Sequence, residues 1–192
     1  MGYSPGRLHS VAVTRSFFNL CPLALAVLAM SDPAHADSLW AGVYRHDITL
    51  AQIHYEGGAD IKGGWIGEPI DALHAIGSPA PHALASVSLG SATNYAALGL
   101  NWTFGSALYA RPGIGVAVND DTYAVRKGKR VDLGSPVTFE PEIAFGWRIT
   151  PEVALEASWI HLSHATLFNR QNRGLDSWGG RAVVPLRHVS DK

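Results

Sequence analysis

The sequence has few charged residues and almost no cysteine. Only 16% of its 192 residues are charged, and 15 Lys and Arg against 16 Asp and Glu give a formal net charge of -1. This balance argues against nucleic acid as a partner, because phosphate binding usually needs a basic surplus. The 20 glycines and 11 prolines follow no collagen-like period and argue against long helices or a coiled coil. The 47% of hydrophobic residues must then either fill a core or face lipid.

The single cysteine, Cys21, lies in an N-terminal segment that we expect to be removed. The segment opens with two arginines and no acidic residue, residues 16–30 are apolar and uncharged, and Ala34-His35-Ala36 gives a small-x-small cleavage pattern. The apolar run is shorter than the roughly 20 residues of a spanning helix. The sequence therefore predicts a signal peptide over residues 1–36 and one domain over residues 37–192. That domain has no thiol, which excludes disulfides and cysteine nucleophiles.

The remaining chain alternates bulky apolar residues with small or polar ones. This period of two is typical of strands, and about ten residues is the length of a tilted transmembrane strand. The clear stretches are 95–104, 108–118, 137–148, 152–163 and 177–186, and weaker ones are 39–46, 59–66 and 83–90. Eight is the smallest even number of strands that closes an outer-membrane barrel. We therefore expect an all-β protein, an eight-stranded antiparallel transmembrane β-barrel.

The two faces of the strands suggest which side meets lipid. The face with the small residues also carries charges, namely Arg111, Glu140, Glu142, Arg148 and Glu156. A narrow eight-stranded barrel can be filled by such residues without forming a channel, while the bulky apolar face points to lipid. A soluble periplasmic barrel or sandwich with the strands turned inside out is the alternative. The signal peptide, the strand lengths and the aromatic residues near strand ends favour the membrane.

Loop lengths predict an orientation. With the new N-terminus in the periplasm, the short connections 105–107 and 149–151 are periplasmic, and the long connections 119–136 and 164–176 are extracellular. The exception is 67–82, a long periplasmic connection in which we expect one helical turn around residues 71–76.

A polar pair ends the apolar face of the stretch 152–163. His161 and Ser163 follow Trp159 on this face, and residues two apart on a strand lie about 6.6 Å from each other. A serine activated by a histidine is a nucleophile, and on a lipid-facing wall its substrate can be the lipid itself. The plain alternative is a polar strand end in the headgroup region, because His-x-Ser is a short and common pattern.

An acidic residue lies across the next turn. Asn172-Arg173-Gly174 is a natural turn sequence, and Asp176 begins the following strand. An antiparallel hairpin brings Asp176 back toward His161, although a solvated aspartate at a strand end has the same sequence signature.

These residues carry a family resemblance. The run Trp159-Ile160-His161-Leu162-Ser163-His164-Ala165, followed by Asn172-Arg173-Gly174-Leu175-Asp176, resembles the active-site hairpin of the outer-membrane lipid A 3-O-deacylases, the PagL family. The resemblance implies an eight-stranded barrel whose catalytic site lies on the outer wall and faces the membrane.

Carried over to this sequence, the resemblance implies the role of each residue. Ser163 is the nucleophile, His161 is the general base, and Asp176 stands where the family usually has Glu. His164 replaces an Asn that helps to form the oxyanion hole, and an imidazole N–H can also donate to an oxyanion. Thr166 replaces a glycine that often follows the motif.

The implied reaction is hydrolysis of the 3-O-linked acyl chain of lipid A in the outer membrane, with lipopolysaccharide as substrate and no metal or cofactor. A catalytically lapsed or purely structural barrel is the alternative, and the oligomeric state stays open, a homodimer included. No two of the other histidines of the predicted domain have metal-ligand spacing, so we expect loop or interface roles for His46, His54, His74, His82 and His188. The basic run 126–130 is either a solvated loop or attracts lipid A phosphates.

Overall fold

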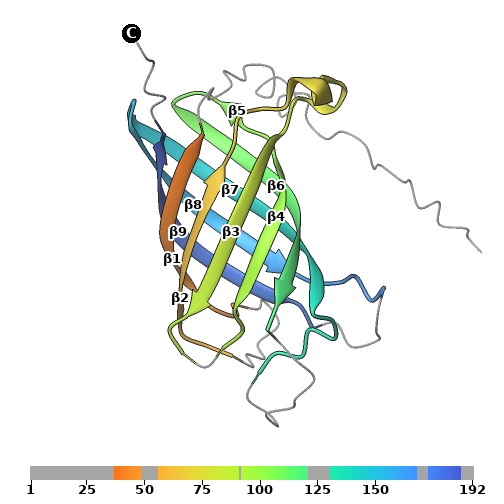
Figure 1. The fold of residues 1–192 in the computed structure, drawn as a ribbon. Coiled ribbons are helices and arrows are strands. Elements are labelled where there is room, and N and C mark those ends of the chain that lie inside the picture. Colours follow the sequence, from red (N-terminus) through yellow and green to blue (C-terminus); the bar gives the residue numbers. More distant parts are fainter. Residues whose placement is uncertain (1–36, 49–55, 91, 121–129, 168–172, 187–192) are drawn as a thin grey trace, which may run out of the picture.

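The chain forms a closed antiparallel barrel (Figure 1). The structure is a computed structural model that describes residues 37–48, 56–90, 92–120, 130–167 and 173–186. Within these residues the barrel strands are β1 (Ser38–Arg45), β2 (Ala59–Ile66), β3 (Ala80–Ser88), β4 (Tyr95–Asn101), β6 (Leu108–Asn119), β7 (Val137–Thr150), β8 (Val153–Leu162) and β9 (Leu175–Pro185). The remaining elements are β5 (Phe104–Gly105), which pairs with β6, and the 3-10 helix η2 (Asp71–Ile76). The predicted signal peptide lies outside the described residues.

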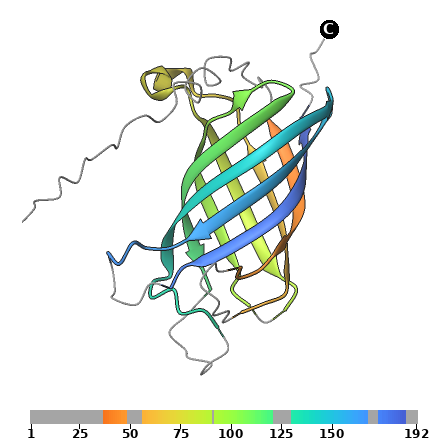
Figure 2. The same cartoon turned by 180° about the vertical axis from the view of Figure 1, so that it is seen from behind.

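Each barrel strand pairs with its neighbours along the chain, and two further pairings complete the ring. β4 pairs with β6 past the short β5, and β1 pairs with β9, which joins the first strand to the last. The two opposite views show the tilted strands surrounding a common interior (Figures 1 and 2). The prediction of an eight-stranded antiparallel barrel is confirmed.

The predicted strand boundaries differ most at β3 and β4, and β4 ends at Asn101 rather than at residue 104. β3 begins at Ala80, three residues before the predicted start at residue 83. His82 therefore pairs with Ile66 of β2 and Gly99 of β4, and its side chain points into the barrel with 4% of its surface exposed. The expectation that His82 is a loop or interface residue is wrong, because the strand pairing extends past Pro81. His54 and His188 lie outside the described residues.

The bulky apolar side chains face outward. Leu98 is 69% exposed, Phe145 63% and Val43 61%, whereas the interior-facing Ala117 and Ala144 are fully buried. A wall of exposed aliphatic and aromatic side chains around the barrel is stable only against lipid, which excludes the inside-out arrangement. The described residues include no helix with the length and hydropathy of a membrane span.

Charged side chains fill the interior, as the alternation predicts. Arg181 of β9 forms ion pairs with Glu142 at 2.7 Å and with Glu156. Arg111 Nη1 lies 2.9 Å from Glu156 Oε1, a close ionic contact rather than an aligned hydrogen bond. Lys62 Nζ donates to Asp60, Ser86 and Tyr95. Buried charges of this kind are tolerated because each is paired.

The 67–79 connection carries the predicted helical turn. η2 spans Asp71–Ile76 and ends at Gly77, whose φ of 91° is in the left-handed region that glycine tolerates. The indole of Trp102, which follows β4, donates a hydrogen bond of 2.8 Å to the carbonyl of Ile76. The turn is therefore tied to the barrel end that we call the inner end, following the predicted orientation.

At the opposite end, which we call the outer end, one carboxylate ties three connections together. Glu56, which precedes β2, accepts from the backbone and hydroxyl of Thr93 between β3 and β4, at 2.9 and 3.0 Å. It also accepts from the backbone N–H of Val131 between β6 and β7 at 3.0 Å, and from His46 after β1 at 2.6 Å. Since His46 is also bonded to Asp60, the loops share one buried network.

This network predicts how the free energy of unfolding depends on pH. Burial by itself would lower the pKa of His46. The hydrogen bonds to Asp60 and Glu56 outweigh this effect and raise the pKa from 6.5 to about 9. Because the pKa is higher in the folded than in the unfolded state, protonated His46 stabilises the fold fully at pH values below the unfolded pKa near 6.5. This stabilisation is lost as the pH rises through the folded pKa of about 9. We expect the free energy of unfolding to fall by on the order of 2 to 3 kcal/mol between pH 6.5 and 9. Urea titrations of the reconstituted protein across this range measure it.

The matched variants are His46→Gln, which should flatten this pH dependence, and His74→Gln, which removes an exposed histidine of η2 and should keep it. An equal slope in His46→Gln and the unmodified protein would assign the pH dependence to other groups.

Candidate active site on the outer wall

The β8–β9 hairpin brings His161 and Asp176 directly opposite each other. The two residues are Cα partners in the antiparallel register, and His161 Nδ1 lies 2.8 Å from Asp176 Oδ1. Both side chains are partly exposed on the outer wall, at 26% and 22%. A carboxylate at Nδ1 holds the ring so that Nε2 is available on the other side, which is the arrangement of a general base.

Trp159 completes the support of this pair. Its indole Nε1 donates a 3.0 Å hydrogen bond to Asp176 Oδ1, the same oxygen that contacts His161. Its ring stacks on the imidazole, with the ring centroids 5.8 Å apart and the planes inclined by 25°. Trp159, His161 and Ser163 share one face of the strand. The indole therefore holds both the Asp176 carboxylate and the His161 imidazole in place.

Gly174 borders the imidazole on another side. Its φ is +71°, and a Cβ at this position would lie 2.7 Å from His161 Cε1. A side chain at position 174 would therefore displace the ring as well as strain the turn. The sequence marked Gly174 only as a turn residue, because its approach to His161 arises from the pairing of two strands.

Ser163 stands just past the end of β8. Its backbone pairs with Phe139 of β7 through two hydrogen bonds, of 2.7 Å and 3.2 Å, which fix it to the wall. The side chain is half-buried. The interactions of the described residues include no hydrogen bond between Ser163 Oγ and His161, and such bonds are often long in structures without substrate.

The residues after Ser163 form a tight turn. The N–H of Leu167 donates to the carbonyl of His164 at 2.9 Å, and Ala165 and Thr166 have φ values of 51° and 59°. Two successive positive φ values are those of a type I′ turn, which favours glycine. The side chain of His164 is fully buried, whereas Ser163 and His161 are partly exposed.

The turn predicts the effect of restoring a glycine. A β-branched residue in the left-handed region is disfavoured by about 1 to 2 kcal/mol, partly offset by the greater unfolded-state entropy of glycine. We expect Thr166→Gly to raise the free energy of unfolding by about 0.5 to 1 kcal/mol, measured by urea titration. Thr166→Ala is the control: it also removes the hydroxyl that donates to the Ala165 carbonyl, but it keeps the Cβ. An equal gain from both variants would contradict the backbone explanation.

An apolar groove lies on the same outer wall, toward the inner end. It has a volume of about 700 Å³, a floor of Ala157, Gly180 and Ala182, and walls that include Val43 and Phe145. The cross-strand pair Trp159 and Trp178 lies between the groove and His161. The small residues of β8 and β9 therefore leave a shallow groove that Trp159 and Trp178 separate from His161.

These features can be compared with known proteins. The family described as Lipid A 3-O-deacylase (PagL) matches residues 53–185. The chain belongs to this family. The fold of this chain is similar to that of a solved structure, "Crystal structure of the outer membrane enzyme PagL". The two sequences are 18% identical, and the TM-score is 0.56 over 78% of this chain and 99% of that one. A de novo designed transmembrane β-barrel matches with 10% identity and a TM-score of 0.51, over 79% of this chain and 96% of that one. No curated protein matches the sequence.

The membership confirms the family suggested by the hairpin sequence and fits an outer-membrane barrel related to lipid A deacylation. The sequence singled out His161, Ser163, His164 and Asp176; the structure brings His161 and Asp176 into contact and leaves Ser163 beside them. The roles of Trp159 and Gly174 were missed. The signal for Trp159 was its position two residues before His161 on the same face.

Proposed function

We propose that this protein is an outer-membrane esterase that removes the 3-O-linked acyl chain of lipid A through Ser163, His161 and Asp176. The observation that carries the proposal is the His161–Asp176 pair at 2.8 Å on a lipid-facing wall, next to a serine on the same strand face. Polar groups on a lipid-facing wall carry a desolvation cost, and membership of the PagL family supplies a role for them.

In the proposed mechanism, His161 Nε2 takes the proton of the Ser163 hydroxyl as the oxygen attacks the ester carbonyl. The tetrahedral intermediate collapses, the sugar 3-oxygen leaves with the proton held by His161, and the acyl chain stays on Ser163. Water then attacks the acyl-serine with His161 as base, releasing the fatty acid. The Asp176 carboxylate accepts the hydrogen bond from the Nδ1–H of His161 throughout and stabilises the imidazolium by its charge.

We assign stabilisation of the oxyanion to the His164 position. Its imidazole is enclosed, so donation from the ring requires the turn at Ala165 and Thr166 to open. The backbone N–H of the residue after the nucleophile is a frequent oxyanion donor. The groove floored by Ala157, Gly180 and Ala182 is suited to an acyl chain, because its lining is mostly apolar and it lies on the same wall as the His161–Asp176 pair.

The proposal includes export and placement. Residues 1–36 would be removed as a signal peptide, and residues 37–192 would insert as the barrel in the outer membrane, with lipopolysaccharide as the substrate. The outer end would be extracellular, which puts His161 and Ser163 at the level of the outer leaflet, where lipid A resides.

A lapsed site is the second candidate, and specific observations favour it. Ser163 and His161 are not hydrogen-bonded, and Thr166 occupies a position whose φ of 59° suits glycine. In this case the protein would be a structural barrel that retains the family fold.

Mass spectrometry of lipid A from Gram-negative cells expressing the protein separates the two. The esterase predicts loss of one 3-hydroxyacyl chain from position 3 in cells with the protein, and an unchanged profile in cells with the empty vector. Heat-modifiable migration of the barrel on gels confirms insertion. An unchanged lipid A profile with fully inserted protein would favour the structural barrel.

The Trp159 indole gives a prediction specific to this site. Trp159→Phe keeps an aromatic ring on His161 but removes the donor to Asp176. Hydrogen bonds to charged groups contribute about 1.5 to 3 kcal/mol, and this one positions the acid without touching substrate. We expect kcat on lipid A in detergent micelles to fall roughly 3- to 30-fold, with KM nearly unchanged. Trp178→Phe, at the cross-strand partner, is the control and should stay within about twofold. Equal losses in the two variants would make the effect one of wall packing.

A further inference from the structure

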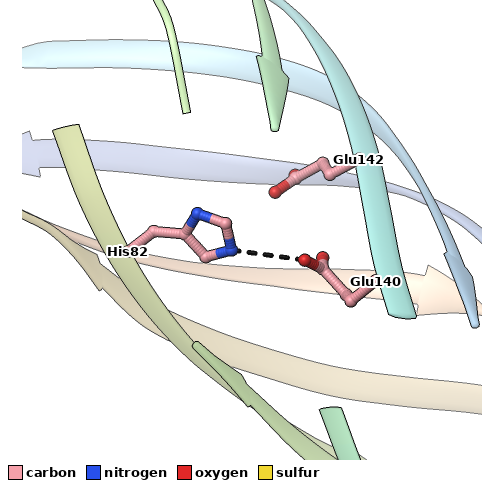
Figure 3. A group of neighbouring side chains, drawn as sticks. All are labelled: His82, Glu140 and Glu142. Atoms are coloured by element: carbon pink, nitrogen blue, oxygen red, sulfur yellow. Dashed lines mark hydrogen bonds and ion pairs between the residues drawn. The ribbon is translucent and has the colours of Figure 1, made fainter. Parts of the chain in front are cut away.

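A second cluster of polar side chains lies inside the barrel. His82 of β3 and Glu140 and Glu142 of β7 point toward one another (Figure 3), and one ligand atom from each lies within 4.8 Å of the others. His82 Nε2 is 3.2 Å from Glu140 Oε2. Their exposed fractions are only 4%, 0% and 8%. The cluster is thus enclosed by the barrel wall and separate from the outer-wall site.

Two glycines make room for this cluster. His82 pairs with Gly99 of β4, Gly99 with Gly115 of β6, and Gly115 with Glu140, so the four residues form one row across the sheet. A Cβ on Gly99 would lie 2.6 Å from His82 Cε1, and one on Gly115 would lie 2.7 Å from Glu140 Oε2. The His82 imidazole and the Glu140 carboxylate therefore meet over Gly99 and Gly115, where a larger side chain would push them apart.

Several ligand atoms in and beside the cluster have no hydrogen-bond partner. Glu140 Oε1 is buried without one, and so is the amide oxygen of Asn101. Asn101 Cβ and His82 Cε1 lie 3.4 and 3.5 Å from the position that a Cβ of Gly113 would take, so the two side chains flank the same point. The contacts of Glu142 with Ser158 and Arg181 both use Oε1, which leaves Oε2 without a hydrogen bond.

Glu140 is also the interior carboxylate with the weakest cationic partner. Asp60 pairs with Lys62, Glu142 with Arg181, and Glu156 with both Arg111 and Arg181. Among the described residues, Glu140 forms an ion pair only with His82, which is charged only when protonated. A fully buried carboxylate is costly unless a cation or proton compensates it.

We propose that His82, Glu140 and Glu142 bind a divalent metal ion inside the barrel, and that Zn²⁺ suits the site best. One imidazole nitrogen with two carboxylate oxygens is a donor set that zinc accepts, whereas Ca²⁺ and Mg²⁺ prefer oxygen ligands alone. An ion bound at about 2.1 Å requires ligand atoms about 3.4 Å apart, so the cluster contracts slightly on binding. The amide oxygen of Asn101 or a water supplies the fourth ligand.

The ion would stabilise the wall that carries Ser163. Glu140 directly follows Phe139, whose backbone pairs with Ser163. The inference does not depend on the proposed esterase function, because metal binding can be measured without substrate.

The test uses the refolded full barrel without a histidine tag, stripped with a chelator and titrated with Zn²⁺. We expect about one tightly bound zinc per chain by elemental analysis after desalting, and a rise in melting temperature of about 5 °C at saturation. Ca²⁺ and Mg²⁺ at the same concentrations should give no rise. Absence of stoichiometric zinc in the folded wild-type barrel would overturn the proposal and identify the cluster as a His–Glu ion pair.

Variants locate the ion. His82→Gln and Glu140→Gln should each lose the bound zinc and the thermal shift, and His82→Gln preserves a polar side chain if Glu140→Gln fails to fold. His161→Gln removes the histidine of the outer-wall His161–Asp176 pair and should keep the full zinc response. A zinc response that survives His82→Gln but disappears in His161→Gln would assign the ion to the outer wall and refute the interior site.

Discussion

Replacing Ser163 by alanine is expected to lower the rate of lipid A deacylation by about 10⁴-fold or more, because neither His161 nor Asp176 can replace the serine in forming the proposed acyl intermediate. Ser163 is anchored by two backbone hydrogen bonds to Phe139, neither of which involves its hydroxyl. The variant should therefore keep the fold and lose only the nucleophile. The measurement is the initial rate on purified lipid A in detergent micelles, with the released fatty acid quantified by mass spectrometry.

The matched control is Ser158→Ala, at the interior-facing serine of β8. Ser158 donates to Glu142 and is buried inside the barrel, so its loss should affect stability more than rate. If Ser163→Ala retained activity while heat-modifiable migration showed a folded barrel, Ser163 could not be the nucleophile.

The second large effect is expected at Asp176. Asp176→Asn keeps an oxygen that can accept from His161 and Trp159 but loses the negative charge that stabilises the imidazolium. We expect kcat to fall by about 10² to 10⁴-fold, the range seen when the acid of a catalytic triad is neutralised. The rates are measured as for Ser163→Ala.

Asp176→Glu is the informative partner. The resemblance of the hairpin implies Glu at this position in the family, and the longer side chain still carries the charge, so we expect activity to stay within about tenfold of that of the unmodified protein. An Asp176→Asn rate equal to that of the unmodified protein would remove the acid from the proposed mechanism. An inactive Asp176→Glu would show that the Trp159 contact requires the shorter side chain.

Most of the strand pattern could be read from the sequence because lipid outside and a narrow interior impose a strict period of two. The stretches 137–148 and 152–163 coincide closely with β7 and β8. The weaker stretch 83–90 was misplaced at its start, because Pro81 and His82 break the apolar alternation although their backbone pairs with β2 and β4. The period-two alternation therefore located strands well where the outward-facing side chains are bulky, and less well where they are small.

The candidate site shows the same division. His161 and Ser163 are two apart along the chain, so their shared face follows from the sequence alone, and the antiparallel pairing of the next strand brings Asp176 close. The sequence could not reveal that Gly174 approaches the imidazole or that Trp159 donates to Asp176, because these contacts depend on the side-chain directions of two paired strands.

By itself the sequence determined the barrel, the lipid-facing side of each strand and the polar pair on that side, because each follows from residues near one another in the chain. Only the tertiary structure decided which interior charges meet. His82 reaches Glu140 across Gly99 and Gly115, and Glu56 joins loops that lie far apart in the sequence. These contacts depend on the register with which the sheet closes, and that register is set by the packing of the whole ring of strands.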